Sequence, residues 1–336
     1  MEQKADNTDV VQQAAAPPVL LLGATGLLGR NVLNLLLQRG IPVRALVRHL
    51  LEVEGVEQVQ GSLLDRDTLL EAAKGCSAIV NCAGTTDMSL PRLEDFLPMN
   101  RDLPALLAQV AGQCGIPVLI HVSTANTIVS GTCDRPATEQ DPIGPPYDKS
   151  PYALSKLAGE EALHSYAAAH PELRLVILNP GFMLGAYDTK PSSGQLMLAA
   201  WRKPLMAGTG GGKSFLHVRD AATAIVNALE KGEGRYLLTG EYLSLKDFYA
   251  LQARVCGYRQ RFVTLPGFLA KIAGGLGDLL KALGIRNMFY SHNVNQLLVQ
   301  EWYSSARAKA DLDYPQTPVS EGIRDFFAWR RESRGR

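Results

Sequence analysis

A tyrosine and a lysine, Tyr152 and Lys156, stand four residues apart in the segment SPYALSKLAGEEAL. The spacing of apolar and charged residues in this segment is helical, and an i,i+4 pair lies on one helix face, so the phenol and the ammonium can point at the same cleft. At about 4 Å and an effective dielectric of about 20, the lysine charge stabilises a phenolate by about 4 kcal/mol, or roughly three pKa units. We therefore expect the pKa of Tyr152 to move from about 10 towards 7, where acid–base catalysis is efficient.

Two hydroxyl residues, Ser123 and Thr124, end the apolar run VLIHVST. Ligands of open α/β sheets bind beyond the carboxyl ends of the strands, where both hydroxyls would emerge. A hydroxyl there can donate a hydrogen bond to a carbonyl or alkoxide oxygen. Taken alone, a Ser–Thr pair is better interpreted as the simple end of a strand. Because this strand precedes the segment with Tyr152 and Lys156, we expect the pair to supply the third catalytic partner of these two residues.

The segment VLLLGATGLLGR places three glycines in GxxGxxG spacing, directly after an apolar run and at the start of a helical one. Gly23 permits the tight turn, Gly26 lets the backbone approach a pyrophosphate, and Gly29 allows close helix–sheet packing. This strand–turn–helix context predicts dinucleotide binding. The residues expected around the dinucleotide are Gly23, Thr25, Gly26, Leu27, Leu28 and Gly29.

The end of the second strand selects between the two nicotinamide dinucleotides. An acidic residue about 20 positions after the glycine motif would bind the ribose 2′-hydroxyl of NAD, whereas arginine accommodates the 2′-phosphate of NADP. The segment VRALVRHL has Arg48 there and no acidic residue. We expect NADP(H), with NAD(H) as the alternative in which Arg48 is only a solvated charge.

Short apolar runs alternate with helical patterns between Val19 and Pro180. This alternation predicts an α/β protein with a Rossmann-type, doubly wound parallel sheet covered on both faces. Strands are expected at 19–23, 43–48, 78–84, 118–124 and 173–180, and helices at Leu27–Arg39, Asp65–Ala73, Leu93–Cys114 and Ser150–Ala169.

The pattern becomes irregular after Pro180, which predicts a smaller C-terminal substrate lobe rather than a second Rossmann domain. We divide the chain into a disordered tail (1–18), an NAD(P)-binding Rossmann core (19–180) and a mainly substrate-binding lobe (181–336) that is interleaved with the core. The features expected in the lobe are a glycine-rich loop at 208–213, a short run at 235–240, and helices at 220–231, 244–255, 268–283 and 320–331.

One helix of this lobe, within 266–284, carries a strong apolar stripe flanked by Lys271 and Lys281. The favoured interpretation is an ordinary amphipathic helix facing the core. A lid or wall for a hydrophobic substrate, and a contact with a membrane surface, are the alternatives. The stripe consists of Phe268, Leu269, Ile272, Leu276, Leu279, Leu280 and Leu283.

Composition excludes several classes of protein. With 336 residues, 34 Lys and Arg against 33 Asp and Glu, and a net charge of +1, the chain lacks the basic excess of a nucleic-acid-binding protein. Its five cysteines are odd in number and without CxxC spacing, which predicts neither a disulfide framework nor a zinc site, and fits a reducing compartment. We expect no metal, no secretory signal and no membrane span, and therefore a cytoplasmic location.

The motifs GATGLLG, NCAG, VSTA, YALSK, NPGFMLG and FLHVRDAA, in this order, make the chain resemble the extended short-chain dehydrogenases/reductases over roughly residues 19–331. This is the NAD-dependent epimerase/dehydratase superfamily, and within it the sequence most resembles the dihydroflavonol-reductase-like and hydroxysteroid-dehydrogenase-like members. The resemblance implies that Tyr152 is the general acid/base and that Lys156 lowers its pKa and holds the nicotinamide ribose. Thr124 takes the family's Ser/Thr role, with Ser123 as the close alternative.

The resemblance extends to further contacts and to the assembly. It implies cofactor contacts from Ser62, Leu63, Ala83, Gly84, Ser123 and Pro180. Ser62 stands where the family often has an aspartate, and Asn100 is the candidate for the asparagine of the family's fourth helix. Phe182 and Met183 either line the substrate pocket or pack in the core. A homodimer is compatible with the resemblance, since the family often pairs through a four-helix face that includes the Tyr152 helix.

Three functions compete. The first is NADPH-dependent reduction of a small or hydrophobic ketone or aldehyde, the reaction of a carbonyl reductase or alcohol dehydrogenase; Arg48 favours it. The second is a sugar-nucleotide epimerase. Lys213 stands where such enzymes often carry a diphosphate-binding arginine, and is either a phosphate contact or a solvated loop residue. The third, a non-catalytic nucleotide sensor, is disfavoured by the complete set of Thr124, Tyr152 and Lys156.

Overall fold

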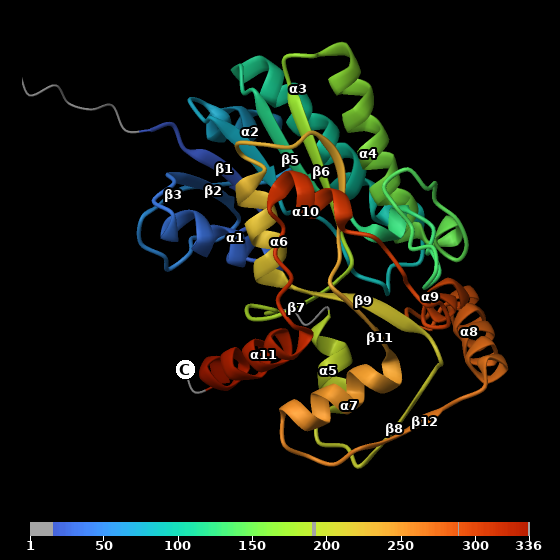
Figure 1. Ribbon diagram of the computed structural model, residues 1–336. Coiled ribbons are helices and arrows are strands. Elements are labelled where there is room, and N and C mark those ends of the chain that lie inside the picture. The colour runs from blue at the N-terminus through green and yellow to red at the C-terminus, as the bar shows by residue number, and fades with distance from the viewer. Residues whose placement is uncertain (1–15, 190–192, 288, 335–336) are drawn as a thin grey trace, which may run out of the picture.

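The computed structural model describes residues 16–189, 193–287 and 289–334. Most of the tail expected at 1–18 therefore lies outside the described residues. The centre of the molecule is a seven-stranded sheet in which all neighbours run parallel (Figure 1). In spatial order its strands are β3 (Val56–Gln60), β2 (Val43–Val47), β1 (Val19–Leu22), β4 (Ala78–Asn81), β5 (Val118–Val122), β6 (Arg174–Pro180) and β10 (Gly234–Leu238).

This strand order confirms the doubly wound Rossmann-type fold, and it reverses direction between β1 and β4, where such sheets bind their ligands. Strands β1, β4 and β5 are completely buried, as continuous apolar runs predict. Side chains of β1 alternate between two hydrophobic clusters on the two faces of the sheet. One face is covered by α1 (Leu27–Gln38), α6 (Val218–Asn227) and α10 (Ala306–Leu312), and the other by α2 (Arg66–Ala73), α3 (Leu103–Cys114) and α4 (Pro151–Ala169).

Two strands differ from the sequence prediction. The edge strand β3 was not predicted, because its sequence VEQVQ is half polar and partly exposed, without an apolar run. Strand β10, which follows the point where we placed the core boundary, pairs with β6 and completes the central sheet.

The helix expected at Leu93–Cys114 is broken into three pieces. A 3-10 turn covers Leu93–Asp95, a π-helical turn covers Pro98–Asp102, and α3 follows. Proline 104 lacks an amide hydrogen and so cannot bond to the carbonyl of Asn100 in an α-helical register. The wide turn lies just before this point, where the Leu103 amide donates to the Pro98 carbonyl five residues earlier, and such turns are frequent at functional sites.

The remaining elements form the C-terminal lobe below the sheet (Figure 1). An aromatic core that contains Phe215, Phe248 and Phe326 holds it together. The expected glycine-rich loop is shorter than predicted, because strands begin and end inside it. The elements are a sheet of β7 (Phe182–Leu184), β9 (Gly212–His217) and β11 (Glu241–Ser244), a ribbon of β8 (Leu205–Gly208) and β12 (Arg261–Thr264), and the helices α5 (Gly194–Ala200), α7 (Leu245–Val255), α8 (Gly267–Ala282), α9 (Ser291–Gln296) and α11 (Val319–Arg334).

Helix α8 contradicts the favoured prediction that its apolar stripe faces the core. Its only buried residues are Gly274 and Gly277, and its large apolar side chains are exposed, among them Leu276 at 57% and Leu279 at 58%. A Cβ on Gly277 would lie 2.0 Å from the carbonyl oxygen of Phe289, so α8 packs on the following segment through its glycine face. Within the described ranges, no helix combines the length and the apolar character needed to cross a bilayer.

Candidate active site

The glycine turn connects β1 to α1 at the edge of the sheet where the strand order reverses. Gly23 has a φ of +82°, in the region that favours glycine, and a Cβ there would lie 2.7 Å from the amide nitrogen of Ala83. A Cβ on Gly29 would lie 2.0 Å from the Gly23 carbonyl oxygen, so α1 packs directly against the turn. Thr25 and Gly26 are exposed, Leu27 is half-buried, and Leu28 and Gly29 are buried.

This turn suits an anion. A Cβ on Gly26 would meet nothing closer than 3.5 Å, which leaves the backbone at the N-terminus of α1 open to an approaching ligand. The first turn of α1 contains no acidic residue that would oppose a phosphate. The residues here therefore fit the pyrophosphate of a dinucleotide.

Arg48 is exposed at the carboxyl end of β2, where its carbonyl accepts a hydrogen bond from Gln60 Nε2 at 3.0 Å. Arg44, on the same strand, is tied to the scaffold by an ion pair with Glu57 at 2.7 Å. Ser62 and Leu63 follow the neighbouring strand β3; Ser62 is exposed, and its Oγ accepts from the Leu64 amide at 3.3 Å. Because β1, β2 and β3 are parallel, Arg48 and Ser62 share an edge of the sheet with the glycine turn.

The segment after β4 links the glycine turn to α4. The Ala83 amide donates to Asn81 Oδ1 at 3.0 Å, and Gly84 is exposed. Asn100, in the π-helical turn, accepts from the Thr85 amide at 2.9 Å and donates to Ser155 Oγ at 2.9 Å. It thereby fastens this segment to α4.

Helix α4 presents Tyr152 and Lys156 near the end of β5. Ser150 caps the helix by accepting a hydrogen bond from the Ala153 amide at 3.4 Å, and Pro151 occupies its first position. Tyr152 shares a side-chain hydrogen bond with Thr124. The buried Lys156 Nζ donates to the Val122 carbonyl at 3.0 Å and lies beside Gly84, where a Cβ would be 2.8 Å from it. The structure thus brings together Thr124, Tyr152 and Lys156.

The electrostatics of this group differ from the expectation. Burial raises the pKa of Tyr152, and the hydrogen bond with Thr124 opposes that rise only in part. Burial also lowers the pKa of Lys156 to about 8, against the attraction of Glu160. The predicted lowering of the Tyr152 pKa by Lys156 was therefore wrong: loss of solvent dominates both groups, and Lys156 donates to a backbone carbonyl instead.

Ser123 is engaged elsewhere, in a buried polar network around Glu160. Its hydroxyl donates to Glu160, which also accepts from Thr127 Oγ1 at 2.9 Å and Asn179 Nδ2 at 2.8 Å, and pairs with Arg235 Nε at 3.1 Å. Of the two hydroxyls that follow β5, the one that contacts Tyr152 is Thr124.

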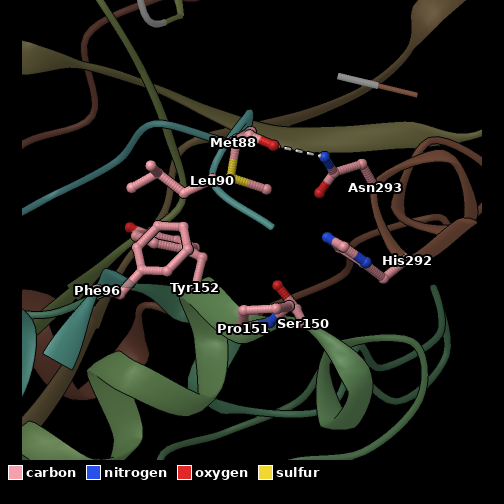
Figure 2. Close-up of a pocket in the computed structure, with 8 residues that line it drawn as sticks. All are labelled: Met88, Leu90, Phe96, Ser150, Pro151, Tyr152, His292 and Asn293. Atoms are coloured by element: carbon pink, nitrogen blue, oxygen red, sulfur yellow. Dashed lines mark hydrogen bonds between the residues drawn. The ribbon is translucent and has the colours of Figure 1, made fainter. Parts of the chain in front are cut away.

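A small pocket adjoins Tyr152 (Figure 2). The Phe96 and Tyr152 rings lie 6.1 Å apart between centroids, and Asn293 Nδ2 donates to the Met88 carbonyl at 2.9 Å across the pocket rim. The space between its lining side chains is too small to hold a water molecule. The lining residues are Met88, Leu90, Phe96, Ser150, Pro151, Tyr152, His292 and Asn293.

Most of this lining was missed in the sequence. His292 and Asn293 come from α9, about 140 positions after Tyr152, and their only signal is that they follow the apolar helix α8. Phe182 and Met183, assigned either to the pocket or to the core, are half-buried and pack against hydrophobic clusters, with Phe182 edge-on to Phe215 at 5.3 Å, which agrees with the core alternative. Pro180 is buried at the end of β6, opposite Leu238.

Lys213 matches neither of its two interpretations. It lies in β9, is buried, and forms an ion pair with Glu301, a carboxylate that also accepts from the Tyr147 hydroxyl at 2.5 Å. The Lys213 ammonium is thereby neutralised inside the lobe rather than solvated or free for a phosphate.

The comparisons with known proteins agree with this fold and with the motif order. The sequence model of the NAD dependent epimerase/dehydratase family matches residues 19–238. A 4-hydroxy-2-methyl-3-oxo-4-farnesyl-3,4-dihydroquinoline-1-oxide ketoreductase of Stigmatella aurantiaca is 30% identical over 77% of this chain and 79% of its own length. Sterol demethylase protein B of Methylococcus capsulatus is 25% identical over 93% of this chain and 98% of its own. The crystal structure of gox2253 superposes with a TM-score of 0.81 at 26% identity, covering 94% of this chain and 98% of that one.

Proposed function

The chain belongs to the NAD-dependent epimerase/dehydratase family, and from this premise we propose that it reduces the carbonyl group of an apolar ketone or aldehyde with NADPH, or oxidises the corresponding alcohol with NADP. Membership makes the protein an NAD(P)-dependent oxidoreductase of the extended short-chain type. The substrate class and the preference for NADP are our proposals.

The observation that carries the proposal is the paired Thr124 and Tyr152 hydroxyls beside an apolar pocket wall. Met88, Leu90 and Phe96 would have to move apart to receive an apolar substrate skeleton, and the two hydroxyls would receive its one oxygen. The names of two relatives, a ketoreductase for a farnesylated quinoline and a sterol demethylase component, point to the same substrate class.

Tyr152 and Thr124 have different roles at the substrate oxygen. The raised pKa keeps the Tyr152 phenol protonated at neutral pH, so that it holds the proton that a reduced carbonyl oxygen must receive. The Thr124 hydroxyl, hydrogen-bonded to the phenol, orients it, and its single proton can pass to the substrate oxygen when a bound substrate replaces that bond. One N–H of the Lys156 ammonium donates to the Val122 carbonyl, and the other two are available for the hydroxyls of a nicotinamide ribose. The bound dinucleotide supplies or accepts the hydride.

The preference for NADP rests on Arg48. Its exposed guanidinium at the end of β2 would pair with a 2′-phosphate, while Arg44 is held by Glu57. The Arg48→Asp variant should therefore shift the NADP/NAD ratio of kcat/KM at least tenfold towards NAD, and an unchanged ratio would contradict the role of Arg48. Substitution of the neighbouring exposed His49 by Asp is the matched control.

The second candidate, a sugar-nucleotide epimerase, is supported by the name of the family. The ion pair of Lys213 with Glu301 counts against it, because the cation expected to hold a diphosphate is already neutralised. Identification of the nucleotide released on denaturing the purified protein separates the two. Stoichiometric NAD would favour the epimerase; an empty site, with NADPH consumed by apolar ketones or aldehydes, would favour the reductase.

The mechanism is tested by Tyr152→Phe. Loss of the phenolic proton should lower kcat by about 10²- to 10⁴-fold, while the dissociation constant for the nucleotide, measured by fluorescence titration, stays unchanged. Ser123→Ala is the control, since Ser123 hydrogen-bonds to Glu160 rather than to Tyr152. Undiminished turnover by the Tyr152→Phe enzyme would rule out the proposed proton donor.

A further inference from the structure

We propose that the exposed face of α8 binds the surface of an anionic lipid bilayer and holds the protein there without crossing it. This goes beyond the proposed reaction and does not depend on it. In Figure 1, α8 lies at the outer edge of the molecule, with α9 between it and the rest of the fold.

The apolar side chains on this part of the surface are concentrated to an unusual degree. Of the fifteen exposed large apolar residues in the described chain, eleven lie between Val263 and Phe289. With 100° per residue, Phe268, Leu269, Ile272, Leu276, Leu279, Leu280 and Leu283 fall within an arc of about 120°. Contiguous exposed patches of this kind mark interaction sites rather than ordinary surface.

The opposite face of α8 explains why the apolar face points outwards. Gly274 and Gly277 are its buried residues, and a Cβ on Gly274 would lie 3.0 Å from the Cα of Ser291. Asp278 accepts a hydrogen bond from the Ser291 amide at 3.1 Å, and Lys281 donates to the Pro91 carbonyl at 2.7 Å. Helix α8 is thus fixed to the protein by its small and polar residues, which leaves its leucines for another partner.

Charge distinguishes a bilayer from a second copy of the chain as that partner. Residues 259–289 contain five basic side chains, Arg259, Arg261, Lys271, Lys281 and Arg286, against the single acidic Asp278, a net charge of +4. The other residues then sum to −3, since the whole chain has +1. Two copies meeting at this face would oppose like charges, whereas anionic headgroups would attract it. An apolar stripe with basic flanks is the pattern of helices that lie in a membrane interface.

The same unit forms one wall of the pocket beside Tyr152. The Tyr290 hydroxyl donates to the Ser89 carbonyl at 3.1 Å, and Asn293 donates to the Met88 carbonyl, so the segment after α8 is fastened to the loop that lines the pocket. A bilayer at α8 would therefore lie next to the pocket wall, where an apolar substrate can arrive from lipid.

The test is co-sedimentation of the full-length protein with vesicles of phosphatidylcholine alone and of phosphatidylcholine with phosphatidylglycerol. We expect binding to the anionic vesicles that weakens with salt. The double variant Leu276→Glu, Leu279→Glu should bind the anionic vesicles with an affinity lowered at least about tenfold, because it places charge in the apolar stripe. The matched control is Leu50→Glu, Leu64→Glu, at positions that are 65% and 46% exposed and follow β2 and β3 rather than lying on α8, and it should bind like the unaltered protein.

Two further measurements keep the test decisive. The Phe268→Trp variant should shift its emission to shorter wavelengths with anionic vesicles and be quenched by brominated lipid. Far-ultraviolet circular dichroism checks that each variant is folded. The proposal is overturned if the unaltered protein binds neither vesicle, or if both double variants lose binding equally. It is also overturned if the protein is a dimer that the Leu276, Leu279 variant separates, without any binding to lipid, since the face would then join two copies.

Discussion

Helices α1 and α8 have the same one-sided apolar pattern and opposite surroundings. Helix α1 buries Leu28, Val32, Leu33 and Leu36 between the sheet and α6, whereas α8 buries only two glycines and exposes its leucines. In each helix one glycine packs directly against a backbone carbonyl: Gly29 of α1 against that of Gly23, and Gly277 of α8 against that of Phe289. A Cβ added to either glycine would lie 2.0 Å from the carbonyl oxygen. Periodicity therefore reports that a helix has an apolar face, and only the neighbouring elements determine what covers that face.

The largest expected effect is a difference in stability and nucleotide binding between alanine variants of Gly29 and Gly277. Gly29→Ala should lower the free energy of unfolding by more than about 4 kcal/mol and abolish nucleotide binding, because the methyl group collides with the glycine turn. Gly277→Ala meets an equal collision but should displace only α8 and α9, leaving nucleotide affinity within about threefold. Thermal unfolding and nucleotide titration measure both effects. Loss of nucleotide binding in Gly277→Ala would show that α8 is coupled to the cofactor half.

Two leucines give the corresponding comparison for packing. Leu33→Ala, at a completely buried position of α1, should destabilise the protein by about 2–5 kcal/mol. Leu279→Ala, 58% exposed on α8, should change stability by no more than about 0.5 kcal/mol. Urea denaturation gives both values. A cost above about 2 kcal/mol for Leu279→Ala would mean that the protein buries this face in solution.

Two lysines extend the comparison to charge. The folded pKa of Lys156, about 8, lies below its unfolded value of 10.5, so the unfolded chain binds more protons between these pH values and stability rises with pH there. Between pH 7 and pH 10 the contribution is about 2–3 kcal/mol. Lys156→Met should remove this rise, while Lys271→Met, on the surface of α8, should keep it. Unfolding free energies at the two pH values test the difference; equal profiles for both variants would contradict the burial of the Lys156 charge.

The last expected effect is a small gain in stability. A Cβ on Gly275 of α8 would meet nothing within 4 Å, so Gly275→Ala should stabilise the protein by about 0.5–1 kcal/mol through helix propensity alone. A rise in the thermal midpoint would agree with this. A fall would indicate that this part of α8 is more crowded than its exposed position implies.

The sequence was sufficient for the core and for the arrangement of Thr124, Tyr152 and Lys156, because buried parallel strands are continuous apolar runs and the motifs sit at their ends. It was insufficient wherever a contact joins distant segments. Glu301, which neutralises Lys213, follows it by 88 residues, and His292 reaches the pocket from a helix with no motif. The pKa of Tyr152 was misjudged for the same reason, since the burial that raises it depends on several elements at once.

The last strand of the central sheet has a consequence for how the chain is made. Strand β10 ends 58 residues after the end of β6, so the ribosome needs about 3 to 12 s to release it once β6 has emerged. During that interval β6 is an edge strand with unpaired backbone groups; α6 is completed only near its end, and α10 only after β10. The nascent chain is therefore most prone to aggregate, and most in need of a chaperone, just after its catalytic residues have been synthesised.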